Sequence, residues 1–391
     1  MKDIVIVDAV RTPVGRFRGS LAGVRADHLG SLVIGKLLER VDLSPSQVDD
    51  VIFGCVTQIG EQSANIARTA LLGAGWPVTI PGLTLDRKCG SGEAAVHAAA
   101  GAIASGMADV IVAGGAENMS RVPMGSNREI HGEAFGWMAA ERYELTSQGE
   151  ASERMADKWS LSREALDDYA FESHQRAAKA ADAGYFDSQI VPVPVELLRE
   201  HALTEPAADL AADETIRRDT SREKLSTLKT SFRPENGRIT AGNSSQISDG
   251  AAALLLMSAD TAKQLGLKAR ARIRAFATVG ADPTLMLTGP IEATKKVLDK
   301  AGLSIDDIDL FEVNEAFASV PLAWMQEIGV PHDKLNVNGG AIALGHPLGA
   351  SGARLMTTLL NELERRGARY GLQAICCAGG LGTATIIERL D

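Results

Sequence analysis

The stretch LTLDRKCGSGEAAVHAAAGAIASGMADVIVAGG, residues 83–115, contains one complete strand–helix–strand unit. It begins with an apolar, β-like run, continues through a long alanine-rich helical segment that Ser91-Gly92 opens, and ends in a β-branched run followed by a glycine pair. Alternation of helices with nearly continuous apolar strands is typical of α/β proteins with buried sheets. This stretch therefore predicts an α/β fold.

The same alternation continues on both sides of this unit. A buried strand is short and apolar, whereas a helix shows a 3.6-residue period, and both patterns recur along the chain. Strands are expected at 3–10, 48–56, 271–280 and 307–313, helices near 26–41, 64–73 and 290–301, and a strand hairpin within 373–390.

The two ends of the chain also share an order of motifs. Ser91-Gly92 opens a helix and is followed by a strand that ends in Ala-Gly-Gly at 113–115, and Ser351-Gly352 precedes the Ala-Gly-Gly at 378–380 in the same way. This similarity predicts a duplicated α/β unit. The alternative is that Ala-Gly-Gly is simply a common strand end.

The segment 119–240 is more charged and less periodic than the rest. We expect it to be an insertion, partly helical at 162–184, where Ser162 can cap the start and Gly184 the end. The predicted organisation is an N-terminal half at 1–118 that is completed by about 241–268, a loop domain at 119–240, and a C-terminal half at 269–391.

Composition excludes several classes of function. The chain has 391 residues and a formal net charge of −10. Because it has no excess of basic residues, nothing in its charge indicates a nucleic-acid partner. The start MKDIVIVDAV is neither a signal peptide nor a membrane span, and no apolar run reaches about 18 residues. The four cysteines show neither a CxxC nor a zinc-site spacing. We expect a cytoplasmic protein with no membrane partner and no metal.

Cys89 lies where the strand of the quoted stretch gives way to the helix. Unpaired N–H groups and the positive end of the helix dipole face that position, and Arg87 and Lys88 add positive charge. These influences predict a pKa below the free value of about 8.5 and a nucleophilic role. A buried cysteine that only fills space is the alternative.

Four further residues, in three motifs, fit the same chemistry. His346 lies in the glycine-rich turn ALGHPLGASG, where it could act as a base or be a structural turn histidine. Asn314 lies at a strand–helix junction, where it could donate to an oxyanion or cap the helix. Cys376 and Cys377 end a strand before a glycine turn, where both could also be buried fillers. A thiolate nucleophile needs such a base nearby.

Six motifs in order resemble the thiolase family over essentially the whole chain: CGSGEAAV, AGGAENMS, GNSSQISDGAAA, NEAFA, GGAIALGHPLGASGAR and CCAGGLGTATIIERL. The resemblance implies a duplicated fold. Two similar α/β halves, each with a mixed five-stranded sheet, would stack in α-β-α-β-α layers, with an inserted loop domain.

The resemblance also implies the roles of the reacting residues. Cys89 would accept the acyl group, and His346 would activate Cys89 and help bind the thioester oxygen. Asn314 would hold a water in that same oxyanion hole. Cys376, chosen over its neighbour by a gapless match to the family pattern, would exchange the proton of the acetyl α-carbon. The N–H of Ala378, with that of Cys89, would form a second oxyanion hole.

Coenzyme A is the substrate that the resemblance implies, with no permanently bound cofactor. Ser245 would lie beside its pantetheine arm, and Arg217 would contact its adenine. Because coenzyme A is a polyanion and the chain is acidic, a local basic patch is needed, and one run supplies candidates: Arg217, Arg218, Arg222, Lys224, Lys229, Arg233 and Arg238. A solvated charged face is the alternative for each of them.

The expected reaction is the thiolytic cleavage of a 3-oxoacyl-CoA by coenzyme A to acetyl-CoA and a shortened acyl-CoA. Ser147 and Gln148 stand where acetoacetyl-CoA-specific members tend to have His-Met, which favours degradation of longer or bulkier acyl chains, as in β-oxidation. Other departures from the family pattern are Asp86, Gln246, Cys377 and Ala378.

The alternatives are a biosynthetic acetoacetyl-CoA thiolase, a ketoacyl-synthase-type condensing enzyme, and a non-catalytic acyl-CoA carrier. A homo-oligomer, a dimer or a dimer of dimers, is expected.

Overall fold

The computed structural model describes residues 3–128 and 130–390. The strands of this part of the chain are β1 (Ile4–Arg11), β2 (Gly15–Arg16), β3 (Asp50–Gly54), β4 (Gly82–Leu85), β5 (Val110–Asn118), β6 (Ser248–Ser258), β7 (Ala271–Gly280), β8 (Leu310–Val313), β9 (Tyr370–Cys377) and β10 (Leu381–Arg389). The helices are α1 (Ala26–Arg40), α2 (Ile66–Gly73), α3 (Ser91–Ser105), α4 (Trp137–Ala140), α5 (Gln148–Lys158), α6 (Arg163–Asp182), α7 (Val195–Arg199), α8 (Arg222–Ser226), α9 (Ala259–Gln264), α10 (Gly289–Ala301), α11 (Ser319–Ile328), α12 (Ala341–Leu344) and α13 (Leu348–Arg366).

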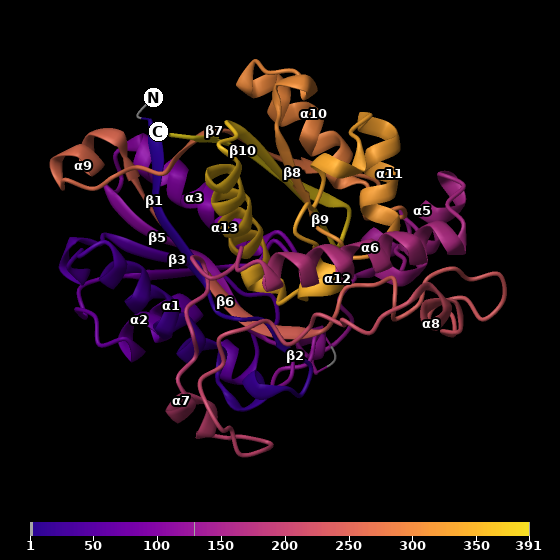
Figure 1. The fold of residues 1–391 in the computed structure, drawn as a ribbon, viewed down its shortest axis with the longest axis horizontal. Coiled ribbons are helices and arrows are strands. Elements are labelled where there is room, and N and C mark those ends of the chain that lie inside the picture. The colour runs from indigo at the N-terminus through magenta and orange to yellow at the C-terminus, as the bar shows by residue number, and fades with distance from the viewer. Residues whose placement is uncertain (1–2, 129, 391) are drawn as a thin grey trace.

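The strands form one sheet in the order β4-β3-β5-β6-β1-β7-β10-β9-β8, and β2 pairs with β6 (Figure 1). Both halves of this path repeat one pattern. In the first half, β3 is parallel to β4 and β5, and β6 and β1 continue antiparallel. In the second, β8 is parallel to β9, and β10 and β7 continue antiparallel. This is the duplicated α/β unit that the sequence predicts.

The structure departs from two separate five-stranded sheets in two details. The fifth strand of the second half is reduced to a single parallel bridge between Phe311 and Leu335. The two halves join through two residue pairs of β1 and β7, Val5 with Arg272 and Ile6 with Ala271. Because this pairing satisfies edge N–H and C=O groups of both strands, the halves share one continuous sheet.

The helices complete five layers, as expected for this fold. Helices α3 and α13 pack against each other between the two halves of the sheet. Helices α1 and α2 cover the outer face of the first half, and α10 and α11 cover the outer face of the second (Figure 1). Each interface has its own buried apolar cluster, and alanines 95, 99 and 100 of α3 allow close packing in the middle layer.

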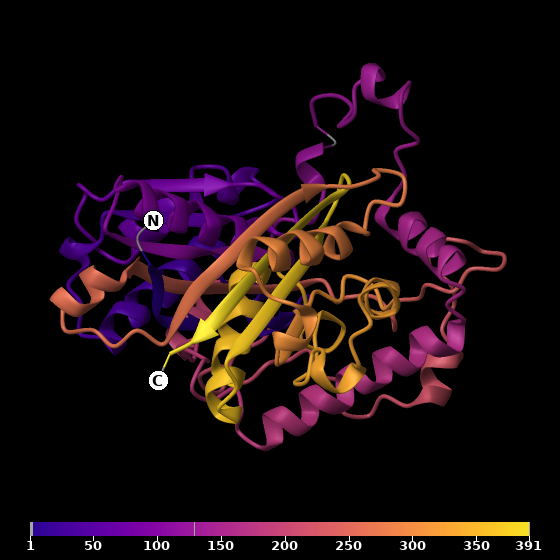
Figure 2. The same cartoon turned by 90° about the horizontal axis from the view of Figure 1, so that it is seen from above.

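The chain between β5 and β6 passes through helices α4 to α8. The hydroxyl of Ser162 accepts the N–H of Ala165 and caps α6, and Gly184 has a φ of +72° just beyond its end. Residues 123–128 and 130–143 stand away from both halves of the sheet (Figure 2). Within residues 3–128 and 130–390, no helix combines the length and apolarity that crossing a membrane requires.

Candidate active site

Cys89 lies in a tight turn between β4 and α3, with its side chain only 3% exposed. Lys88 adopts a left-handed φ of +51°. The Ser91 hydroxyl accepts the N–H of Arg87 at 2.8 Å and donates to the carbonyl of Lys88 at 2.6 Å. These bonds hold the turn and fix the sulfur at the start of α3.

The expected low pKa of Cys89 is wrong. Burial raises the pKa of this thiol to about 11, which outweighs the N–H groups of Ala378 and Cys89 that face the sulfur. Lys88 favours the thiolate, but Asp86 opposes it and forms an ion pair with Lys88. The resting thiol is therefore protonated, and the site needs a base.

His346 lies between α12 and α13 and is 5% exposed. The hydroxyl of Ser351 donates to the carbonyl of Pro347 at 2.9 Å, so it accepts from Nδ1 of His346 at 2.6 Å. With its proton on Nδ1, the ring carries its lone pair on Nε2. Burial, together with the charge of Arg354, lowers the pKa of His346 to about 3. His346 is thus a neutral imidazole that can accept a proton at Nε2.

Asn314 follows β8 directly and is 1% exposed. Its N–H donates to the carbonyl of Ala374 on β9 at 3.0 Å, because parallel strands end at the same edge of the sheet. Its side-chain Nδ2 lies 3.3 Å from Nε2 of His346, and its Oδ1 has no hydrogen-bond partner among the described residues. The amide can therefore bind the histidine and a water together, rather than cap a helix.

Cys376 and Cys377 are fully buried at the end of β9, and strand alternation turns them to opposite faces. Cys376 belongs to the buried apolar cluster that also contains Ala316 and Ala378, while Cys377 belongs to the one that contains Cys89. Burial raises the pKa of both thiols well above the usual range, and the neighbouring Cys89 raises each of them further. The structure thus brings Cys89 together with both cysteines and with Ala378.

Two glycine contacts bring the start of α13 against the start of α3. A Cβ on Gly92 would lie 2.8 Å from the carbonyl oxygen of Gly349, and one on Gly352 would lie 2.1 Å from the N of Glu93. Leu348, two residues beyond His346, packs in the same cluster as Cys89. The turns that hold Cys89 and His346 are therefore neighbours because these positions lack side chains.

Ser245 lies beside this group. Its N–H donates to the carbonyl of Ala316 at 2.9 Å, and Ala316 belongs to the same buried cluster as Cys376. The adjacent Gln246 is a departure from the family pattern. Its side-chain amide donates to the carbonyls of Thr215 and Ile342, and its backbone carbonyl accepts the N–H of His346. Sequence reasoning missed this positioning role of Gln246, as it missed Ser351.

The basic run near Arg217 is mostly neutralised. One of its cations, Lys224, pairs with Asp219 of the run itself, and four form ion pairs with carboxylates elsewhere in the fold: Arg218 with Asp182, Arg222 with Asp168, Arg233 with Glu150 and Asp157, and Arg238 with Asp157. In the part of the chain that the structure describes, Arg217 and Lys229 form no ion pair. These two remain as cations for an anionic ligand.

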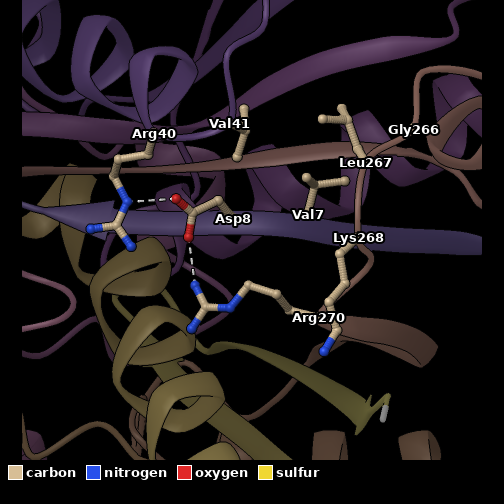
Figure 3. Close-up of a pocket in the computed structure, with 8 residues that line it drawn as sticks. All are labelled: Val7, Asp8, Arg40, Val41, Gly266, Leu267, Lys268 and Arg270. Carbon is tan, nitrogen blue, oxygen red and sulfur yellow. Dashed lines mark hydrogen bonds and ion pairs between the residues drawn. The ribbon is translucent and has the colours of Figure 1, made fainter.

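A separate surface pocket lies over β1 and the loop that precedes β7 (Figure 3). Asp8 at its centre binds Arg40 at 2.7 Å and Arg270 at 2.5 Å. Its lining holds no cysteine or histidine and consists of Val7, Asp8, Arg40, Val41, Gly266, Leu267, Lys268 and Arg270. Because its carboxylate is already paired, this pocket offers no nucleophile or base. No cluster of three metal-ligating side chains occurs among the described residues.

A cysteine in the turn before α3, a neutral histidine in the turn before α13 and an asparagine at the end of β8 agree with the family comparison. The thiolase N-terminal domain matches residues 4–260, and the thiolase C-terminal domain matches residues 267–389. The chain belongs to the thiolase family. It is an acyltransferase with an α/β thiolase fold, as its motifs predict.

Similar thiolases cover the whole chain. A steroid 3-ketoacyl-CoA thiolase of Mycobacterium tuberculosis is 49% identical over 100% of this chain and 95% of its own length. A 3-ketoacyl-CoA thiolase of Serratia proteamaculans is 46% identical, and a beta-ketoadipyl-CoA thiolase of Acinetobacter baylyi is 45% identical, each over 100% of both chains. The acetyl-CoA acetyltransferase of Bacillus anthracis superposes with a TM-score of 0.89 at 40% identity, covering 100% of this chain and 99% of that one. The prediction of a degradative thiolase that cleaves 3-oxoacyl-CoA is confirmed, and the biosynthetic alternative is not favoured.

Proposed function

We propose that Cys89, His346, Asn314 and Cys376 are the reacting groups of this thiolase. In the first half-reaction, Nε2 of His346 takes the Cys89 proton, and the thiolate attacks the 3-oxo carbon of the substrate. The N–H groups of Cys89 and Ala378 bind the resulting oxyanion. As the bond between C2 and C3 breaks, the acetyl-CoA enolate leaves with its oxygen near Asn314, and Cys376 donates a proton to C2.

The second half-reaction reverses these proton movements. The Cys376 thiolate takes the proton of an incoming coenzyme A thiol, whose sulfur attacks the acyl carbonyl on Cys89. Cys89 leaves as a thiolate and takes back its proton from His346. The acyl group stays a thioester throughout, so no ATP is consumed.

The observation that supports this assignment most directly is the protonation of the two partners. The Cys89 thiol is neutral because it is buried, and the lone pair of His346 is on Nε2 because Ser351 accepts from Nδ1. The test is to mix the protein with a 3-oxoacyl-CoA in the absence of free coenzyme A and to quench in acid. We expect the acyl mass on the peptide that contains Cys89. Acylation of another residue would overturn the assignment.

We propose that the acyl pocket accepts chains longer or bulkier than acetoacetyl. Ser147 caps α5 by accepting the N–H of Glu150, and Gln148 begins that helix. The segment just before it is tied to the loop before α10, because Thr146 donates to the carbonyl of Thr284 and Thr284 donates to that of Glu144. The relatives named for steroid and ketoadipyl substrates support such a pocket.

A panel of 3-oxoacyl-CoAs tests this pocket. Each methylene that the transition state buries contributes up to about 0.8 kcal/mol, so three of them raise kcat/KM by tens-fold. We expect 3-oxo-heptanoyl-CoA, which has three methylenes more than acetoacetyl-CoA, or a ring-bearing 3-oxoacyl-CoA to exceed acetoacetyl-CoA by that factor. A clear preference for acetoacetyl-CoA would overturn the proposed pocket.

We propose that Arg217, together with Ser245, binds coenzyme A, and that Lys229 adds charge to the same site. Support comes from the lack of an ion pair at Arg217 and Lys229 among residues 3–128 and 130–390, whereas Arg222 is bound to Asp168. Arg217→Ala should raise KM for coenzyme A several-fold and leave kcat within a factor of two. Arg222→Ala is the matched control and should leave both unchanged. An equal effect of the two variants would contradict the assignment.

We propose a homotetramer built as a dimer of dimers. The segment that stands away from the sheet exposes six apolar side chains, more than a monomer usually leaves in water: Met124, Ile130, Phe135, Trp137, Met138 and Tyr143. Light scattering of the full chain should give a tetramer, and Trp137→Asp with Met138→Asp should give a dimer. Met107→Asp is the control: Met107 lies just beyond the end of α3 and is 83% exposed, outside the segment that stands away, so this variant should leave the tetramer intact.

We also propose the domain division 1–118 with 241–268, 119–240 and 269–391, in which the loop domain covers the bound coenzyme A. The proposed location is the cytoplasm. Four free cysteines, Cys55, Cys89, Cys376 and Cys377, support that location because it keeps thiols reduced.

A further inference from the structure

The carboxyl group of Glu315 lies between the segments that carry Asn314 and His346. Glu315 comes directly after Asn314 at the end of β8 and is 1% exposed. It belongs to the NEAFA motif, but the proposed reaction gives it no role. Four groups donate hydrogen bonds to its two oxygens: Tyr169 Oη at 3.0 Å, Ser173 Oγ at 2.7 Å, Asn336 Nδ2 at 2.9 Å and the N–H of Ile342 at 3.1 Å.

All four partners of Glu315 are donors. The Asn336 Nδ2 group and the backbone N–H of residue 342 have no acceptor atom. The Tyr169 hydroxyl accepts from Nδ2 of Asn336 at 3.0 Å, and the Ser173 hydroxyl accepts the N–H of Gly340 at 3.1 Å, so both hydroxyl protons are left for Glu315. Burial raises the pKa of this carboxyl group, and the four donors counter that rise. Both oxygens act as acceptors, which a carboxylate can do and an amide cannot.

The same cluster fixes the backbone on both sides of Asn314. The side-chain amide of Asn336 accepts the N–H of Val313 and donates to its carbonyl, each at 2.9 Å. The N–H of Asn314 itself donates to Ala374 of β9. Because Glu315 is held as well, three successive residues at the end of β8 are fixed in place, and the direction of the Asn314 side chain is fixed with them.

The carboxyl group also reaches the segment that leads to His346. Ile342, its donor in α12, is four residues before His346. Gly340 leaves room for this approach, because a Cβ there would lie 2.2 Å from Cδ of Glu315. The two segments that Glu315 joins are those whose side chains meet, with Asn314 Nδ2 at 3.3 Å from His346 Nε2.

We propose that Glu315 is a positioning residue that sets the distance between Asn314 and His346 and so shapes the oxyanion hole in which the acetyl-CoA enolate forms. The inference rests on the proposed function of those two residues. Both oxygens of Glu315 are taken up by the four donors, so it acts through Asn314 and His346 and not on the substrate.

Glu315→Gln is the smallest change that breaks this arrangement. If the new NH₂ group replaces Oε1, it faces Nδ2 of Asn336, and that amide cannot turn over because its Oδ1 accepts the N–H of Val313. If the NH₂ group replaces Oε2, it faces the N–H of Ile342. Two donors meet in either orientation, so one of the two segments must move.

The test is a double-mutant cycle on deuterium exchange at the methyl group of acetyl-CoA. Asn314→Ala removes a contact of the oxyanion hole and should slow exchange by about 10²-fold. Glu315→Gln should slow exchange by about 10-fold or more in the wild-type background, because a small displacement of a reacting group is costly. In the Asn314→Ala background it should slow exchange less than about twofold. A simple loss of folded protein would instead act equally in both backgrounds.

Glu153→Gln is the matched control. Glu153 is a fully buried carboxylate of α5 that accepts the N–H groups of Arg238 and Ile239, and in the described structure it bonds to neither of the two segments. Its variant should slow exchange less than about twofold in either background.

Two further variants approach the same carboxyl group from other sides and serve if Glu315→Gln does not fold. Gly340→Ala pushes the carboxyl group away with its Cβ, and Tyr169→Phe removes one of the four donors. Both should slow exchange in the wild-type background only, and Tyr169→Phe should have the smaller effect because three donors remain.

Two results would overturn the proposal. One is a Glu315→Gln enzyme that exchanges at the wild-type rate, or that loses as much in the Asn314→Ala background as in the wild type. The other is a crystal structure of Glu315→Gln in which Asn314 Nδ2 and His346 Nε2 keep their separation. A failure of the proposed function gives a different result: Asn314→Ala itself would exchange at the wild-type rate. The crystal structure then still decides whether Glu315 sets this distance.

Discussion

Two glycine pairs look alike in the sequence but serve different purposes in the two halves. Gly114 and Gly115 lie inside β5, where a Cβ on Gly115 would fall 2.0 Å from the carbonyl oxygen of Gly349. Gly379 and Gly380 instead form the turn between β9 and β10, with φ values of +90° and +76°. In the first pair, Gly115 permits the close approach of α13 and Gly114 that of β6, whereas the second pair reverses the chain. After duplication, the same tripeptide has been retained for two separate physical reasons.

The chemistry of the halves diverges in the same way. The turn before α3 holds Cys89, and the equivalent turn before α13 holds His346. Each turn opens a middle-layer helix that continues with Ser-Gly, at Ser91 and at Ser351. The first half holds the proposed nucleophile, Cys89, but not the base, and the second half supplies the base, His346. A half taken alone therefore has no complete set of reacting groups.

The largest expected loss of activity comes from removing the Cys89 thiol, the reacting group that the first half contributes. Cys89→Ser should reduce thiolysis on the order of 10³-fold or more, because a serine hydroxyl is far less acidic than a thiol. Steady-state thiolysis of a 3-oxoacyl-CoA measures it. Cys55→Ala, at the other cysteine of that half, should retain turnover. A Cys89→Ser enzyme within tenfold of wild type would contradict the nucleophile assignment.

The vicinal cysteines of the second half should differ from each other. Cys376→Ala should slow deuterium exchange at the methyl group of acetyl-CoA by about 10²-fold or more, which is the usual range for a lost acid–base group. Cys89 of this variant should still accept the acetyl group from acetyl-CoA. Cys377→Ala should exchange at close to the wild-type rate. If the two variants behave in reverse, Cys377 is the acid–base residue.

The two glycine pairs predict unequal losses of stability. Gly115→Ala forces a methyl group onto backbone atoms of α13 and should lower the free energy of unfolding by about 3 kcal/mol or more. Gly379→Ala meets no atom within 4 Å and carries only the cost of a positive φ, about 1 kcal/mol. Urea denaturation of both variants checks this comparison. Equal losses would mean that α13 does not depend on close approach at β5.

A pH effect should mark the contact between the halves. Glu93 on α3 accepts hydrogen bonds from Thr383 and Thr385 of β10, and burial raises its pKa to about 7. Between the unfolded pKa of about 4.3 and that value, the native state holds a proton that the unfolded state lacks. Stability should therefore fall by up to about 1.4 kcal/mol per pH unit as pH rises through this window.

Glu93→Gln should remove this dependence. Denaturation of both proteins at pH 5 and pH 7 measures it, and the difference between wild type and variant is the quantity of interest. The same slope in both proteins would show that the Glu93 carboxyl does not titrate in this window.

Local patterns were enough to predict much of the fold. β7 has the bounds of the strand predicted at 271–280, and α6 begins after the predicted cap, Ser162. These features depend on neighbours a few residues away, which periodicity and capping report directly. The join between β1 and β7 depends on residues more than 260 positions apart, and no local pattern encodes it.

Long-range partners also explain what was missed at the site. The sequence shows the positive charges beside Cys89 but not the burial that outweighs them, so the predicted sign of its pKa shift was wrong. It shows a basic run but not Glu150 and Asp157, which bind Arg233 from a distant helix. Gln246 seemed only a departure from a motif, yet its amide joins two other segments.

The position of β6 sets an order of events during synthesis. Strand β1 pairs with β6 in a register that joins Ile4 to Ser258 and Arg11 to Ala252, and β5 pairs with the other edge of β6. At about 5–20 residues per second, the ribosome needs roughly 10–50 s to deliver β6 after β1 has emerged. During that interval the edges of β1 and β5 that later pair with β6 present unpaired N–H and C=O groups. Nascent chains of this protein should therefore bind holdase chaperones until residue 258 leaves the exit tunnel and release them soon afterwards.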